Sequence, residues 1–167
     1  MKLILVTKAV VLTVTASLLA LAAPRAAAQN VLDEIEVARS TLKADRKIII
    51  AEGLQLTEAE SAAFWPLYRQ YRAEMDKCAD GIVELVLEYA DLYPNVPEDR
   101  AKKLLKDYTA LEQKYASQRA WYLKKFTKVL PAVKAMRFAQ LENRLDLAVR
   151  LRLASVIPLV PADAKVK

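Results

Sequence analysis

The chain has 167 residues and a formal net charge of +6 at pH 7, with no histidine, two glycines and one cysteine. Without histidine the chain lacks the commonest acid–base catalyst and metal ligand, and a single cysteine excludes an internal disulfide bond. So few glycines leave few tight turns, which disfavours a many-stranded β fold. Composition therefore favours an α-helical protein that contains neither obvious catalytic groups nor a metal site.

The first 28 residues have the features of a secretory signal peptide. Lys2 and Lys8 provide a positive start, an apolar run follows over residues 9–23, and Ala26-Ala27-Ala28 is an A-x-A cleavage site. The apolar run is short for a transmembrane helix, and no stop-transfer pattern follows it. We therefore expect cleavage after Ala28 and a periplasmic mature protein without a membrane anchor.

Cleavage would also change the charge of the protein. It removes Lys2, Lys8 and Arg25 and no acidic residue, so the formal charge falls from +6 to +3. A mildly basic exported protein gives no reason to expect nucleic acid as a partner. The remaining chain is predicted to form one helical domain over residues 29–160, followed by a flexible tail over residues 161–167.

The mature chain begins with a predicted short helix over residues 31–51, which Asn30 can cap. Apolar residues recur in this segment at helical spacing: Ile35, Ala38, Leu42 and Ile49. Gly53 follows the segment and is suited to the left-handed position after a helix. We therefore expect Gly53 to end this helix.

A second helix is predicted to begin with Thr57-Glu58-Ala59-Glu60, which is a capping box. In such a box the Thr57 hydroxyl accepts from the Glu60 amide, and the Glu60 carboxylate accepts from the Thr57 amide. Apolar residues then follow at alternating steps of four and three: Phe64, Tyr68, Tyr71, Met75, Cys78, Ile82, Leu85, Tyr89 and Leu92. This heptad stripe predicts one long helix with a single apolar face, kinked by Pro66.

Residues 93–97 contain two prolines and predict a loop, after which Pro97 can open a third helix that ends near residue 129. Its apolar residues again have heptad spacing: Leu104, Tyr108, Leu111, Tyr115, Tyr122 and Val129. Two long helices with apolar stripes, joined by a short loop, predict an antiparallel hairpin. In this hairpin Cys78 should lie near Leu111.

Pro131 is expected to open a fourth helix that ends near Ala154. Residues Leu145–Ala154 also alternate like a strand, but their leucine, alanine and arginine content favours a helix. Because this segment is apolar on more than one face, we expect it to be buried on two sides. Leu147 and Leu151 are therefore the candidate dimer contacts.

Three groups of residues have alternative interpretations. Cys78 could be a reactive thiol or form an intermolecular disulfide, but its place in the stripe favours a small core residue. The tyrosines could form a ligand platform, but their positions on the two stripes favour core packing. The acidic cluster of Glu84, Glu88 and Asp91 could do acid–base chemistry, but it more readily matches basic residues across the hairpin.

The last third of the mature chain is rich in basic residues. These side chains could simply form a solvated face, or they could bind acidic partners, unfolded clients or the membrane surface. The candidate client-binding residues are Lys124, Lys128, Arg137 and Arg144.

Leu56-Thr57-Glu58-Ala59-Glu60 resembles the L-T-x-x-Q signature of the Spy/CpxP family of periplasmic proteins, with Glu60 in place of glutamine. Where many members repeat the signature before the last helix, this chain has Leu130-Pro131, with proline in place of threonine. The resemblance implies an all-α, cradle-shaped dimer that acts as an ATP-independent chaperone or as a regulator of envelope or metal stress. Metal-binding relatives use histidine, methionine and cysteine near their ends, a pattern that this chain does not match, so we expect no metal or other cofactor.

We therefore expect an exported, non-enzymatic helical binding protein. It would be a chaperone or envelope-stress accessory protein that forms a homodimer and binds envelope proteins or unfolded clients, with peripheral contact to the membrane surface as a further expectation. The alternative is a structural or regulatory adaptor with one dedicated protein partner, such as a stress or metal-response sensor. No nucleophile–base pair can be drawn from the sequence, so an enzyme is not expected.

Overall fold

The computed structural model describes residue 37 and residues 45–162, which form an all-helical chain. A helical segment over residues 45–54 precedes α3 (Glu58–Leu92), α4 (Glu98–Val129) and α5 (Ala132–Val156). The expectation of an all-α fold is confirmed. The predicted signal peptide, most of the predicted first helix and residues 163–167 of the predicted tail lie outside the described residues.

Helix α3 begins at the predicted capping box. The amide of Glu60 donates to Thr57 Oγ1 at 3.3 Å, and the amide of Thr57 donates to Glu60 Oε2 at 2.8 Å. Lys134 of α5 also reaches Glu60, with 2.5 Å between Nζ and Oε2. The cap therefore also joins the start of α3 to α5.

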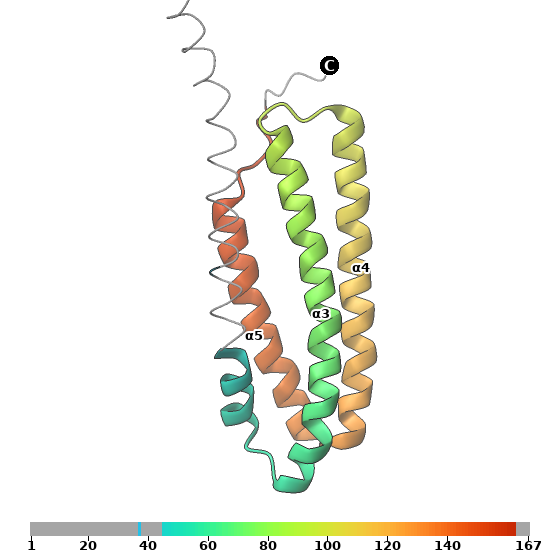
Figure 1. Ribbon diagram of the computed structural model, residues 1–167, viewed down its shortest axis with the longest axis vertical. Helices are drawn as coiled ribbons and strands as arrows, with labels where there is room; N and C mark the ends of the chain where they lie inside the picture. Colours follow the sequence, from blue (N-terminus) through green and yellow to red (C-terminus); the bar gives the residue numbers. More distant parts are fainter. Residues whose placement is uncertain (1–36, 38–44, 163–167) are drawn as a thin grey trace, which may run out of the picture.

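Helices α3 and α4 lie side by side and run in opposite directions from the loop that joins them (Figure 1). Near this loop Glu88 binds Arg100 at 2.7 Å and Lys103 at 3.2 Å, so this member of the acidic cluster forms ion pairs with α4. Farther along, Leu111 packs over Gly81, one turn beyond Cys78. A Cβ atom on Gly81 would lie 2.8 Å from Leu111 Cδ2, so the missing side chain allows close approach of the two helices.

The buried core lies at the opposite end of the molecule, where α4 turns into α5 (Figure 1). Aromatic rings from all three helices meet there. The ring of Phe126 lies 5.3 Å from that of Phe64 and 4.4 Å from that of Phe138, and the rings of Tyr71 and Tyr122 are 5.6 Å apart. These contacts hold the three helices together at this end.

The helical segment over residues 45–54 corrects the expected role of Gly53. The helix continues through Gly53 to Leu54, and Gln55 takes the left-handed conformation instead, with a φ of 47°. Gly53 is needed for packing, because a Cβ atom there would lie 2.6 Å from Leu141 Cδ1 of α5. The carbonyl groups at this helix end accept hydrogen bonds from α5, where Arg137 donates to Gly53 and Lys134 donates to Gln55.

Helix α5 includes the whole segment Leu145–Ala154 for which a strand was the alternative. Leu145 faces the core and is 8% exposed, whereas Leu147 and Leu151 are 55% and 74% exposed. Within the described part of the chain, the face of this segment that carries Leu145 is buried. The opposite face, which carries Leu147 and Leu151, is exposed. Among the described residues, none of the helices combines the length and the apolar character that crossing a membrane requires.

Candidate functional site: an apolar cavity between α3, α4 and α5

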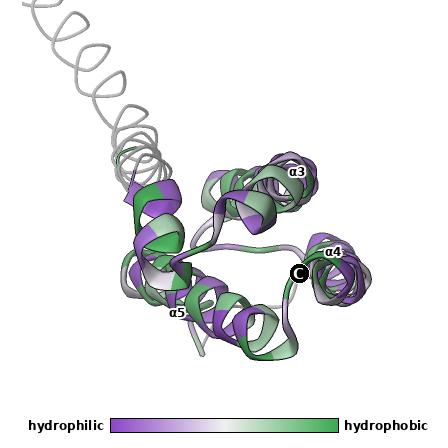
Figure 2. Cartoon of the chain, turned by 90° about the horizontal axis from the view of Figure 1, so that it is seen from below, coloured by the Kyte–Doolittle hydropathy of each residue, from purple (hydrophilic) through white to green (hydrophobic). Residues whose placement is uncertain are grey.

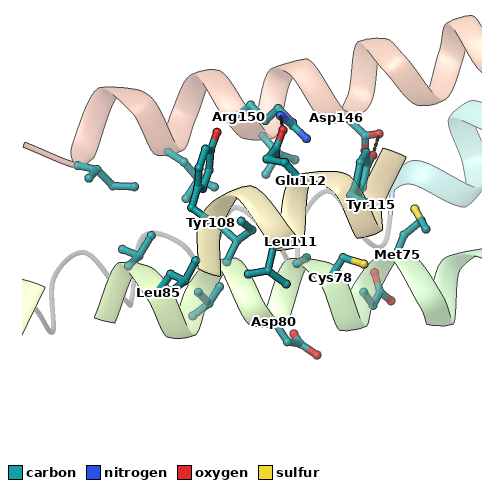
Figure 3. Close-up of a pocket in the computed structure, with 18 of the residues that line it drawn as sticks. Met75, Cys78, Asp80, Leu85, Tyr108, Leu111, Glu112, Tyr115, Asp146 and Arg150 are labelled. Carbon is teal, nitrogen blue, oxygen red and sulfur yellow. Dashed lines mark hydrogen bonds and ion pairs between the residues drawn. The ribbon is translucent and has the colours of Figure 1, made fainter. Parts of the chain in front are cut away.

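The three helices surround a cavity of about 1100 Å³. Figure 2 shows α3, α4 and α5 arranged around a common centre, and Figure 3 shows side chains from all three at the cavity wall. Along α3 the wall extends from Tyr68 and Arg72 to Tyr89. Most of it is apolar, with these aliphatic side chains among the lining residues: Met75, Ile82, Leu85, Leu104, Leu111 and Val149.

The cavity occupies the second half of the heptad stripe of α3. The first half, from Phe64 to Cys78, is buried against aromatic rings. The second half, which includes Ile82, Leu85 and Tyr89, is only partly buried. Figure 1 shows why, because α5 diverges from α3 and α4 beyond the aromatic core. The same sequence pattern therefore produces a packed core at one end and a cavity at the other.

A buried carboxylate separates the core from the cavity. Glu142 of α5 is 1% exposed and accepts hydrogen bonds from four side chains. The donors are Arg46 at 2.8 Å, Arg72 at 3.2 Å, Tyr71 at 3.1 Å and Tyr68 at 3.3 Å. Two guanidinium groups and two phenols thus satisfy the acceptor capacity of the carboxylate, which makes its burial tolerable.

The same cluster affects the acidity of the tyrosines around it. Burial, together with the nearby charge of Glu142, raises the pKa of Tyr68 and of Tyr71 well above the usual range. Burial and the charge of Asp146 do the same to the pKa of Tyr115, whose hydroxyl donates a very short hydrogen bond to Asp146. These phenols therefore stay protonated and act as hydrogen-bond donors.

Further polar contacts bound the cavity on the side between α4 and α5. Arg150 of α5 binds Glu112 of α4 at 3.1 Å, and Tyr115 of α4 donates to Asp146 of α5 (Figure 3). Asp146 also accepts from Arg46 at 3.0 Å, which ties the segment over residues 45–54 to α5. Near the loop between α3 and α4, the Tyr89 hydroxyl donates to the carbonyl of Pro158 at 2.9 Å. Arg46, Glu112, Asp146 and Arg150 are thus engaged in ion pairs at the wall.

The buried cluster was not predicted from the sequence, although one signal for it exists. Glu142 occupies a position in an apolar stripe of α5 that also contains Ala135, Phe138, Leu145 and Val149, at alternating steps of three and four. A charged residue in such a position requires buried partners. Spacing alone does not say that these partners are arginines from two other helical segments.

Cys78 lies in the buried half of the α3 stripe and also lines the cavity. It is a free cysteine, 2% exposed, and burial raises the pKa of its thiol. These properties agree with its interpretation as a core residue, since a raised pKa and low exposure both slow thiol chemistry.

The candidate client-binding residues lie elsewhere. Lys124 and Lys128 are exposed on α4, and Arg137 and Arg144 are exposed on α5. None of the four lines the cavity. The tyrosines are not gathered around them as exposed rings. Tyr71 and Tyr122 are buried, four others line the cavity (Tyr68, Tyr89, Tyr108 and Tyr115), and the exposed Tyr93 lies at the far end of α3. An exposed aromatic ring on α4 is that of Trp121, which holds Lys125 Nζ 3.5 Å from its centre.

Within the residues that the structure describes, no three histidine, cysteine, aspartate or glutamate side chains are grouped as a metal site would need. The chain matches none of the protein-family models, curated proteins or solved structures with which we compared it. Its similarity to the Spy/CpxP signature therefore remains a hypothesis that rests on residues 56–60 and the order of the helices.

Proposed function

We propose that this protein is an exported, non-enzymatic binding protein, which acts in the periplasm as an ATP-independent chaperone or an envelope-stress accessory protein. The observation that carries the proposal is the apolar cavity of about 1100 Å³ between α3, α4 and α5. Unfilled apolar space costs stability, because the side chains around it lose packing partners. A large apolar cavity between helices is, in contrast, a common form of binding site.

Basic surface residues would contribute to the encounter with clients. Lys124, Lys128, Arg137 and Arg144 are exposed on α4 and α5, where they can attract acidic partners before apolar groups are buried. Such attraction weakens as salt increases. A peripheral contact with an anionic membrane surface would depend on the same residues.

The proposed working form is a homodimer. Leu147 and Leu151 lie on the outward face of α5, away from Leu145 and the core, and both are exposed. A second copy of α5 could cover them in a symmetric contact, because a two-fold dimer uses the same patch on both chains. The cradle shape implied by the Spy/CpxP resemblance is part of this proposal.

The proposal can be tested by measuring aggregation of several unrelated clients by light scattering, without ATP. We expect the mature protein to slow aggregation and Val149→Trp, which places a bulky ring in the cavity, to lose most of this effect. Ala148→Trp is the matched control, because Ala148 is exposed and does not line the cavity. Urea unfolding of both variants verifies that they fold.

A second arm tests the surface charges. Replacing Lys124, Lys128, Arg137 and Arg144 together with glutamate should weaken client binding and remove its dependence on salt. If no client is protected and one protein from the envelope binds tightly and saturably instead, the dedicated adaptor is the correct function. Equal protection by the protein and by Val149→Trp would show that the cavity is not the client site.

A further inference from the structure

The dimensions of the cavity restrict what it can hold. From Arg72 to Tyr89 the wall follows 17 residues of α3, or roughly 25 Å at about 1.5 Å per residue. The cavity is thus long and runs along the apolar face of α3.

The electrostatics of the wall point in the same direction. Arg46 and Arg72 bind Glu142, and Arg150 binds Glu112, so these cations already have carboxylate partners. Among the described residues, no buried side-chain nitrogen or oxygen lacks a hydrogen-bond partner. A polar ligand would gain little from this wall, whereas hydrocarbon gains from leaving water.

We propose that the cavity binds the hydrocarbon chain of a single-chain amphiphile, such as a long-chain fatty acid or a lysolipid. The chain lies along α3 between Arg72 and Tyr89, against Ile82, Leu85 and Val149. A length of roughly 25 Å accommodates about 20 carbons, since each C–C bond advances an extended chain by about 1.3 Å. The polar headgroup stays outside the apolar wall. This inference rests on the proposed function in that both use the cavity.

Two properties of binding follow. Affinity should rise about fourfold for each added methylene, because each buries about the same apolar area. The headgroup should matter little near Arg46, Arg72 and Arg150, since these cations are already paired with carboxylates. Two amphiphiles with equal chains, one with a carboxylate and one with a trimethylammonium headgroup, should therefore have dissociation constants within about threefold of each other. A direct ion pair between the protein and one headgroup would produce a larger difference.

The experiment is displacement of a fluorescent fatty acid from delipidated mature protein, with carboxylates of increasing length below their micelle concentrations. We expect the dependence on chain length in wild type and in Ala148→Trp, and its loss in Val149→Trp. Affinity that is independent of chain length, or equal binding by Val149→Trp, would overturn the inference. So would a carboxylate preferred tenfold or more over the matched trimethylammonium, because that result indicates an anion site.

Cys78 provides a second readout that does not depend on a probe. Its thiol lines the cavity, so a bound chain should shield it from iodoacetamide. At a ligand concentration ten times the dissociation constant, the labelling rate should fall about tenfold, as the population of empty cavities does. An unchanged rate at saturation would place the ligand elsewhere and contradict the inference.

The two proposals fail in different ways. If clients are protected through the cavity and no amphiphile binds, the amphiphile inference is wrong and the chaperone function stands. If amphiphiles bind with the expected dependence on chain length and no client is protected, the chaperone function is wrong and this inference stands.

Discussion

Tyr71 of α3 donates a hydrogen bond to Glu142 of α5 at 3.1 Å, in a place where each residue is 1% exposed. The Tyr71 ring also packs against Phe126 and Phe138, so one side chain belongs both to the aromatic core and to the polar cluster beside the cavity. The cluster thus fixes the position of α5 against α3 at the point where the two helices begin to diverge. Its integrity should matter for stability and for the shape of the cavity.

Replacing Glu142 with alanine should destabilise the protein by about 3–5 kcal/mol, because the buried guanidinium group of Arg46 and the partly buried one of Arg72 lose their shared carboxylate. The measurement is the free energy of unfolding from urea titration. Glu112→Ala is the matched control, since its ion pair with Arg150 is partly exposed and should contribute only about 0–1 kcal/mol. Equal losses in the two variants would contradict a special role for Glu142.

Thr57→Ala should lower the free energy of unfolding by about 0.5–2 kcal/mol, because the Glu60 amide then loses its side-chain acceptor. Thr57→Ser retains the hydroxyl and should change stability little. Urea midpoints for the three proteins test this prediction. Identical midpoints for wild type and Thr57→Ala would mean that the cap does not contribute.

Acid should remove a stabilising contribution from Glu88. Hydrogen bonds from Lys103 and Arg100 lower the pKa of Glu88 from its ordinary value of 4.5. Because the folded pKa is the lower one, the contribution is fully present above the unfolded value and is lost as pH falls through the folded value. Near pH 7, Glu88→Gln should therefore be less stable than wild type, with the difference vanishing near pH 2. Glu84→Gln, at an exposed position on the same helix, is the control. If the stability difference between wild type and Glu88→Gln does not change with pH, the stabilising role of the Glu88 carboxylate is refuted.

Leu147→Asp and Leu151→Asp should each convert the proposed dimer to a monomer, because a charge would be buried in an apolar contact. Sedimentation velocity at micromolar concentration measures the change. Leu105→Asp on α4 is the control, since Leu105 is 67% exposed but lies on another helix. A wild-type protein that sediments as a monomer would rule out the dimer.

Local signals in the sequence were enough to locate α3, α4 and α5. Thr57 and Glu60 marked the start of α3 because a capping box needs only four neighbouring residues. The two prolines of residues 93–97 and the heptad spacing on either side placed the loop and two long helices. These features depend on residues close together in the chain, and so does the preference of Leu145–Ala154 for a helix.

The tertiary structure alone decided what each apolar face meets. Phe64 and Ile82 belong to one stripe with one spacing, yet Phe64 is buried among rings and Ile82 lines a cavity. Spacing identifies the apolar face of a helix, but the angle at which α5 leaves that face and the size of its side chains determine whether the space is filled. Gly53 and Glu142 follow the same rule. Leu141 approaches Gly53 closely, and two arginines converge on Glu142. Both contacts join segments that are distant in sequence.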